Sequence, residues 1–270
     1  MNLSLSTGFL RPRTVEEVVD VCRASGTTSL EFWGQDGLFT ETNDYAKLSN
    51  RLRSSGLTVG SVHAPFTTDS SIDDTCYGEY LNRFSTTCNA AAEVGAHRLV
   101  VHPLSWRGET PKGRGAIRDT MPRSFAFWEH VVRTAASYGL ATALENLPAS
   151  VAWPGGCHIG LVKRIVEELD LDGVGICIDL SHCMANGESP LSLRDSPDVE
   201  IGVIHVSDGI QGMDRHLPPG EGDHDWSLLR NELFVPNPNA ALVLEVRSPY
   251  LSGFLVGEMC CFLDGNDRDV

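Results

Sequence analysis

Eight short apolar segments alternate along the chain with stretches that have the periodicity of amphipathic helices. The apolar segments are rich in Val, Ile and Leu and are nearly continuous, which is typical of strands buried on both faces of a sheet. The strand candidates are residues 2–7, 28–33, 57–64, 97–103, 140–146, 174–180, 199–208 and 240–246. Since strands that alternate with helices pair in parallel, the pattern predicts a parallel α/β fold.

Eight strand–helix units in 270 residues match a (β/α)8 TIM barrel. An open, doubly wound sheet is the alternative, but no Gly-x-Gly-x-x-Gly follows the first strand. No segment has the composition of a disordered linker, so we expect a single domain over residues 1–270. In the first helix, Thr14 is the expected N-cap and Gly26 the expected C-terminal stop. The segments after the sixth and eighth strands predict only short helices.

The composition of the chain indicates its cellular compartment and narrows the classes of molecule that it can bind. No run of 18 apolar residues exists, and the N-terminus lacks the features of a signal peptide, so we expect no membrane association. The eight cysteines form no Cys-x-x-Cys pair, which favours free thiols in a reducing, cytoplasmic compartment. The formal charge of −15 repels polyanions at long range, although bound metal ions can invert the potential locally.

Six consecutive strands have a His, Asp or Glu at or near their carboxyl ends. In a TIM barrel these ends surround one mouth, which is where such barrels place their active sites. The candidate metal ligands are His63, His102, Glu145, Asp179, His182, His205 and Glu245, followed by Asp214 and His216 in the stretch DRHLPPGEGDHDW (214–226). A buried cluster of carboxylates without matching Lys or Arg is costly, and divalent cations would neutralise it. Imidazole with carboxylate suits zinc, manganese, iron or cobalt, and magnesium is a further candidate.

At these residues the sequence resembles the xylose-isomerase-like TIM-barrel superfamily, which includes sugar and sugar-phosphate isomerases and epimerases and the apurinic endonucleases of the endonuclease IV type. The most specific part is HVSD…DRHLPPGEGDHDW, which resembles the D-x-H-x-x-P-G-x-G-x-x-D-W signature of isomerase-like members. The resemblance to the isomerases implies a single metal ion held by Glu145, Asp179, His205 and Glu245, with His182 and Arg215 near the substrate. The resemblance to the endonucleases implies two further ions. His63 and His102 would join Glu145 at one, and His182, Asp214 and His216 would hold the other.

The resemblance leaves two chemistries open. In the first, a metal-dependent isomerase or epimerase acts on a sugar, a sugar phosphate or a related polyhydroxy carbonyl compound through an enediolate. Glu145 and Glu245 would exchange the proton, and His182 and Arg215 would polarise oxygen atoms. Alternatively, both glutamates serve only as ligands.

In the second, two or three zinc or manganese ions activate a hydroxide that cleaves a phosphoester, as in the apurinic endonucleases. The net charge of the site differs between the two chemistries. With one divalent ion, the four carboxylates leave the site negative, which suits a neutral substrate. With three divalent ions the site is positive, which suits a phosphate. A metal-dependent oxidase or lyase on the same fold is a third possibility, which no residue of the sequence specifically favours.

Further residues are candidates for substrate binding. Four aromatic residues follow strand ends and could stack on a sugar or base, or could simply pack loops: Trp33, Phe66, Trp106 and Trp153. Arg247 could bind an anionic group of the substrate. Arg107 belongs to a basic loop with Lys112, Arg114 and Arg118 that either clamps a phosphate or is a solvated surface. Nucleic acid would require more cations than these, so a small carbohydrate is the expected partner, and a homo-oligomer remains open.

Overall fold

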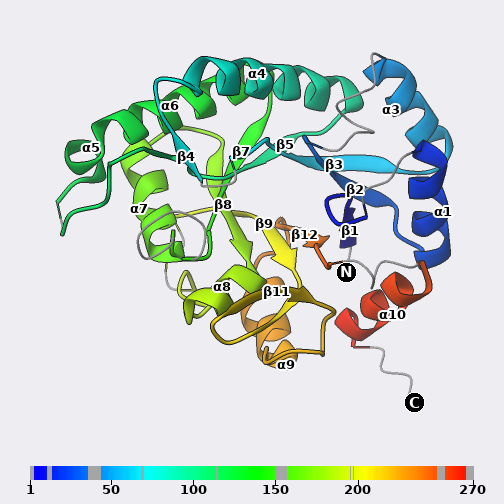
Figure 1. Ribbon diagram of the computed structural model, residues 1–270. Helices are drawn as coiled ribbons and strands as arrows, with labels where there is room; N and C mark the ends of the chain where they lie inside the picture. Colours follow the sequence, from blue (N-terminus) through cyan, green and yellow to red (C-terminus); the bar gives the residue numbers. More distant parts are fainter. Residues whose placement is uncertain are drawn as a thin grey trace.

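Eight parallel strands close into a barrel in the computed structural model, which describes residues 3–10, 14–35, 44–67, 70–113, 115–149, 157–194, 196, 198–247 and 253–265 (Figure 1). In barrel order the strands are β1 (Leu3–Ser6), β12 (Ala241–Leu244), β9 (Ile201–Val206), β8 (Val174–Asp179), β7 (Ala141–Glu145), β5 (Arg98–Val101), β3 (Thr58–His63) and β2 (Ser29–Trp33). Each corresponds to one of the eight strand candidates, and the predicted TIM barrel is confirmed. Two short pairings lie outside the barrel: β4 (Ser71–Ile72) with β6 (Ser105–Trp106), and β10 (Asp208–Ile210) with β11 (Met213–Leu217).

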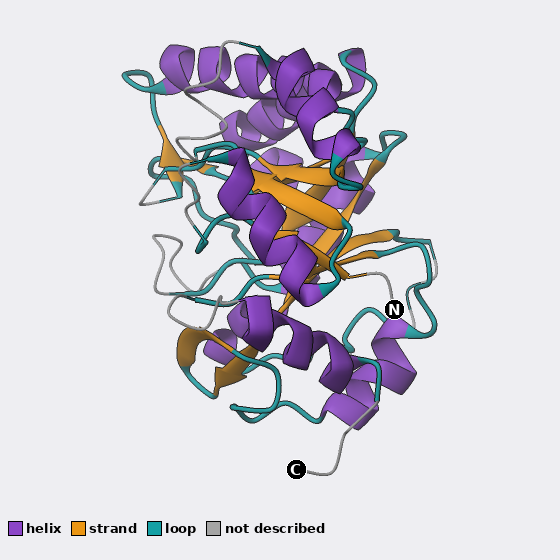
Figure 2. Ribbon diagram, turned by 90° about the vertical axis from the view of Figure 1, so that its right-hand side faces the viewer, coloured by secondary structure: helices purple, strands orange, loops and turns teal. Residues whose placement is uncertain are grey.

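Helices surround the barrel, as Figure 2 shows. They are α1 (Val15–Ser25), α3 (Tyr45–Ser54), α4 (Tyr77–Val94), α5 (Ile117–Thr120), α6 (Pro122–Ser137), α7 (Ile159–Leu169), α8 (Leu180–Asn186), α9 (Trp226–Leu229), which runs into a π-helical turn at Arg230–Phe234, and α10 (Gly253–Leu263). As predicted, Thr14 Oγ1 accepts a hydrogen bond from the Glu17 N–H at 3.2 Å, and Gly26 ends α1 in the left-handed conformation (φ 74°). The helix after the eighth strand is longer than expected, because α10 packs along α1 and gains stability from that contact.

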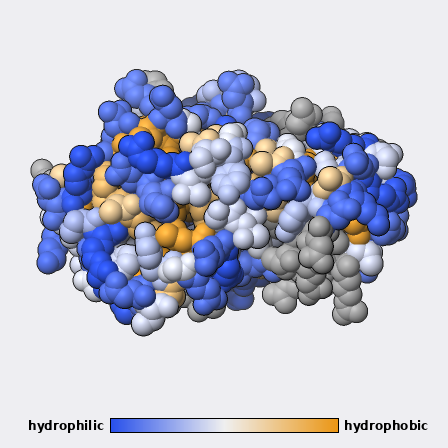
Figure 3. Space-filling view, turned by 90° about the horizontal axis from the view of Figure 1, so that it is seen from above, coloured by the Kyte–Doolittle hydropathy of each residue, from blue (hydrophilic) through white to orange (hydrophobic). Residues whose placement is uncertain are grey.

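The outer surface matches this arrangement. The face seen from above, over the helices at the top of Figure 1, is largely hydrophilic, with hydrophobic areas in small patches (Figure 3). No helix in the described part of the chain is long and apolar enough to cross a bilayer. All eight cysteines are free thiols, as expected.

The barrel interior contains a small apolar layer that is separate from the main core between sheet and helices. Five strands contribute one side chain each to this layer: Val100, Ala143, Cys177, Val203 and Val243. Side chains on a strand alternate between its two faces, so the residue two positions further along each strand also points inward. Those residues are His102, Glu145, Asp179, His205 and Glu245. Strand periodicity therefore places a ring of polar groups directly above an apolar floor.

Candidate metal centre

Four of the expected ligands meet at the mouth of the barrel. Ligand atoms of Glu145, Asp179, His205 and Glu245 lie within 4.8 Å of one another, and all four side chains are buried. His205 Nδ1 lies 2.7 Å from Glu245 Oε2, 3.3 Å from Glu145 Oε1 and 3.6 Å from Asp179 Oδ2. Asp179 Oδ2 and His205 Nδ1 have no hydrogen-bond partner among the described residues, which is costly at a buried site. A divalent cation would satisfy both atoms, and the three carboxylates and one imidazole fit such an ion.

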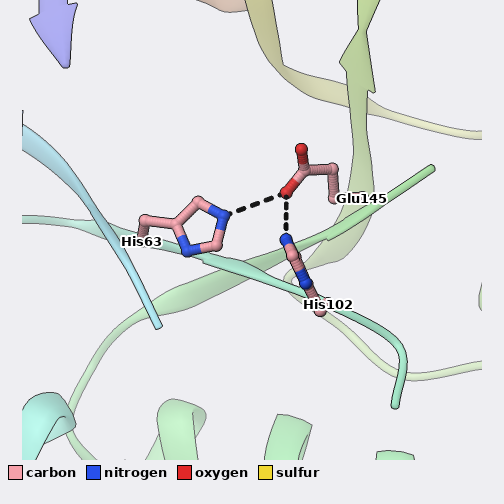
Figure 4. Close-up of side chains that lie close together, drawn as sticks. All are labelled: His63, His102 and Glu145. Atoms are coloured by element: carbon pink, nitrogen blue, oxygen red, sulfur yellow. Dashed lines mark hydrogen bonds and ion pairs between the residues drawn. The ribbon is translucent and has the colours of Figure 1, made fainter. Parts of the chain in front are cut away.

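A second group shares Glu145 with the first. His63 Nε2 and His102 Nε2 lie 3.0 Å and 3.2 Å from the same oxygen, Glu145 Oε2, and both imidazoles point at it in Figure 4. His63 Nδ1 faces the Ala64 carbonyl oxygen at 2.9 Å. Because a carbonyl can only accept, that nitrogen bears a proton, and neutral His63 would direct a lone pair at a carboxylate oxygen. Such a contact needs a cation or a second proton between the two atoms.

The third group lies on the other side of the cluster. Asp179, His182 and His216 bring ligand atoms within 4.8 Å of one another. Asp214 Oδ1 lies 3.0 Å from His216 Nε2 and 4.0 Å from His182 Nε2. The nine expected ligands thus form three adjacent groups, although Asp214 is also held by other partners.

Burial and charge at this site work against each other. Burial raises the pKa of Glu145, but His205 and His102 lower it well below its usual range. Burial likewise opposes ionisation of Glu245, yet His205 and His216 bring the pKa of that carboxyl to about 2. Burial lowers the pKa of His216, while Asp179 and Asp214 raise it to about 10. The cluster therefore attracts positive charge, which protons supply when no metal ion does.

The stretch DRHLPPGEGDHDW divides into a front part at the site and a back part that supports it. Asp208 Oδ1 accepts the N–H groups of Gly209 and His224, and Oδ2 accepts the N–H of Gly220 and the indole N–H of Trp226, at 2.8–3.2 Å. Asp225 caps α9 as expected, by accepting the Leu228 N–H. Asp208, the one acid of HVSD, is fully buried, and its supporting role was not predicted from the sequence.

The front part is held by α8. Ser181 Oγ accepts the N–H groups of Arg215 and His216, both at 3.0 Å, and donates to Asp214 Oδ1 at 2.9 Å. His216 adopts a left-handed backbone conformation (φ 45°), which a non-glycine residue adopts only when its surroundings hold it there. Asp214 and His216 are thus fixed by contacts outside their own hairpin.

A cavity of about 300 Å³ opens over the three groups. One wall is aromatic: Trp33 lies 5.5 Å from Phe9 and 5.6 Å from Phe66 between ring centroids, and Phe66 stacks on His102 at 4.5 Å. The polar and charged lining also includes His63, Glu145, His182, Asp214, His216, Glu245 and Arg247. Trp33, Phe66 and Arg247 were expected near the substrate, whereas Phe9 was not predicted.

Three expected substrate-binding or catalytic residues do not line this cavity. Arg215 is exposed, because alternation along β11 turns it away from Asp214 and His216. Trp106 is buried beneath the Arg123 guanidinium, 3.7 Å from its ring centroid. Arg107 pairs with Asp73 at 3.0 Å in the loop after β6. These positions do not support the contacts expected of them, and Trp153 and Arg114 lie outside the described residues.

Glu31 is a site residue that the sequence analysis missed. It lies on β2, is fully buried, and its Oε1 is 3.1 Å from His205 Nε2. The only sequence signal was an acid in the middle of an apolar strand, SLEFW. An ionisable residue at such a position requires a partner within the barrel.

The fold and the site together define a TIM barrel with a candidate metal centre at its carboxyl-terminal mouth. The chain belongs to the xylose isomerase-like TIM barrel family, whose sequence pattern matches residues 19–258. The predicted family resemblance is confirmed.

Two kinds of relative were found. "Probable endonuclease 4" of Mycobacterium leprae is 27% identical over 155 residues, which are 53% of this chain and 55% of that protein. The chain thus matches about half the length of such curated relatives. Among solved structures, a D-tagatose 3-epimerase-like protein superposes with a TM-score of 0.77 at 18% identity, covering 98% of both chains. The IOLI protein, solved with a bound zinc atom, gives 0.78 at 17% identity over the whole of both chains. At this identity the two structures support the shared fold alone.

Proposed function

We propose that the protein is a divalent-metal-dependent isomerase or epimerase acting on a sugar, a sugar phosphate or a related polyhydroxy carbonyl compound. The observation that carries the proposal is the placement of two glutamates around one imidazole nitrogen. Glu145 ends β7 and Glu245 follows β12, and both reach His205 Nδ1, at 3.3 Å and 2.7 Å. Two other strands separate β7 from β12, so the carboxylates approach from different sides.

Glu145, Asp179, His205 and Glu245 would hold the metal ion, which would supply Lewis acidity toward a carbonyl and its adjacent hydroxyl. The two glutamates then form an acid–base pair, in which one removes the proton next to the carbonyl and the other returns it to the neighbouring carbon or the opposite face. Their lowered pKa values keep both carboxyls ionised at neutral pH. Arg247 lines the cavity and can donate to substrate oxygens, a role that we assign to it in place of Arg215. His182 lines the cavity too, but its Nδ1 proton faces the Asn146 carbonyl oxygen at 2.8 Å, so a neutral His182 has an acceptor nitrogen, Nε2, on its other side.

The cavity supports a small substrate. At about 300 Å³ it lies at the lower end of the range for small-molecule sites, roughly 300–1,000 Å³. A lining that combines aromatic rings with polar groups is suited to a sugar, whose ring has an apolar face and hydroxyls at its edge. The epimerase-like structural neighbour is consistent with this substrate class.

Phosphoester hydrolysis is the second candidate, because the groups around His63 and around His182 could hold two more ions. The endonuclease 4 relatives point the same way. Against it, Asp214 is already paired with Arg247 at 3.1 Å, and few cations lie near the mouth among the described residues. We therefore prefer the isomerase.

The test is proton exchange in deuterated water. The manganese- or zinc-loaded protein is incubated with a panel of ketoses, aldoses and their phosphates, and NMR follows deuterium entering at the carbon next to the carbonyl. We expect exchange and product with at least one substrate, and none with Glu145→Gln. Cleavage of DNA containing abasic sites, without exchange in any sugar, would instead establish the hydrolase.

A further inference from the structure

Glu31 is a buried carboxylate that the proposed chemistry does not use. The Ser61 hydroxyl on the neighbouring strand β3 donates to Glu31 Oε2 at 2.7 Å. Oε1 lies 3.1 Å from His205 Nε2, within ion-pair distance, and neither atom has a hydrogen-bond partner among the described residues. Burying a carboxylate costs several kcal/mol, as an order of magnitude, unless a partner offsets the cost. His205 is the partner that the structure offers.

The two nitrogens of His205 face different surroundings. Nδ1 is within 3.6 Å of oxygens from Glu145, Asp179 and Glu245, and Nε2 is beside Glu31. A neutral imidazole has a lone pair on one nitrogen and a proton on the other. His205 can bind a metal ion at the cluster only when its proton is on Nε2.

Three other histidines of the site are oriented by main-chain carbonyls, whereas His102 Nδ1 has no hydrogen-bond partner among the described residues. The Nδ1 atoms of His63, His182 and His216 lie 2.9, 2.8 and 3.0 Å from the carbonyl oxygens of Ala64, Asn146 and Glu245. In each case the carbonyl keeps the proton on Nδ1 and leaves Nε2 free for the cluster. His205 has the opposite orientation, and neither of its nitrogens is hydrogen-bonded to a carbonyl in the described structure.

We infer that Glu31 is a positioning residue for the metal centre: its carboxylate holds the proton of His205 on Nε2, so that the Nδ1 lone pair faces Glu145, Asp179 and Glu245. A carboxylate in this place also makes the imidazole a stronger ligand, as partners of metal-bound histidines generally do. Ser61 in turn fixes the carboxylate. The inference rests on the metal site of the proposed function and is independent of the substrate.

The test compares metal affinity in Glu31→Gln and wild type. Calorimetric titration of zinc or manganese into the metal-free proteins should show an affinity loss of roughly 10- to 100-fold, the usual cost of removing such a partner. The matched control is Glu200→Gln, which removes a half-exposed carboxylate that pairs with Arg98. We expect this control to bind metal like wild type. In the zinc-loaded wild type, long-range ¹H–¹⁵N NMR should find the His205 proton on Nε2.

The outcomes separate the two proposals. An affinity of Glu31→Gln within twofold of wild type, or a His205 proton on Nδ1 in the loaded protein, overturns the role of Glu31. If Glu31→Gln does not fold, Ser61→Ala decides: it should weaken binding in the same direction by a smaller factor, and unchanged affinity overturns the role. Metal binding without turnover of any sugar contradicts only the proposed reaction. Failure of wild type to bind metal refutes both.

Discussion

Arg247 and Asp214 face each other across the rim of the cavity, with Nη2 3.1 Å from Oδ2. The same guanidinium lies 5.7 Å from the ring centroid of Phe9. A carboxylate that is paired with arginine is less available to a metal ion, and an arginine that is paired with a carboxylate is less available to a substrate anion. This ion pair therefore affects how many metal ions the site can bind and whether the arginine is available to a negatively charged substrate.

Breaking the pair should change the metal content. We expect about one tightly bound zinc per wild-type chain, since the three-carboxylate site is the most buried, and additional zinc in Arg247→Met because Asp214 is released beside His182 and His216. Elemental analysis after gel filtration at limiting zinc measures both. Three ions in the wild-type protein would contradict the mononuclear site and favour the hydrolase.

Loss of the Glu145 charge should abolish activity. Glu145→Gln removes a shared ligand and an acid–base group, so we expect turnover to fall by at least about 10²-fold, the lower limit of general acid–base contributions. Glu129→Gln on α6 is the matched control, because its carboxylate accepts hydrogen bonds from Arg133 and lies outside the candidate site. Full turnover by Glu145→Gln would show that the reaction occurs elsewhere.

Trp33 and Trp106 form a natural pair for testing the aromatic wall. Trp33→Ala should raise the KM for a sugar by up to about tenfold, because one aromatic contact contributes about 0.5–1.5 kcal/mol. Trp106→Phe should leave KM unchanged, since Trp106 packs under Arg123 away from the cavity. Steady-state kinetics on both variants measure the difference. Equal effects would mean that the wall does not contact substrate.

The pH dependence of stability follows from the histidines. The pKa of His216 is about 10 in the folded chain against 6.5 ordinarily, so its contribution is fully present below about pH 6.5 and is lost as the pH rises toward 10. The melting temperature of the metal-free protein should therefore fall over this range. Bound zinc replaces the protons and should flatten the decline, which thermal unfolding with and without a chelator would reveal. A metal-free protein equally stable at pH 7 and pH 10 would contradict the charge balance described above.

The sequence predicted that the polar residues at the ends of the barrel strands meet at one mouth, because apolar runs mark the strands and the first polar residue beyond each run faces the barrel mouth. Neither rule could identify Glu31, because it lies inside a strand and its partner His205 comes close only when the barrel closes. Arg215 was placed near the substrate because the β10–β11 hairpin, which turns it outward, left no pattern in the sequence. Trp106 was misjudged for a similar reason, since β6 leads it under a neighbouring helix.

The four N–H groups gathered by Asp208 have a consequence for ligand binding. The N–H groups of Gly220, His224 and Trp226 tie the PPGEGDHDW segment to Asp208 in β10, while Ser181 ties the preceding residues 214–216 to α8. The conformational entropy of this loop is therefore lost when the chain folds, not when a ligand arrives. Asp214 and His216 meet an incoming ion or substrate as a preorganised pair, so the affinity of this side of the cavity depends on electrostatics more than on loop ordering.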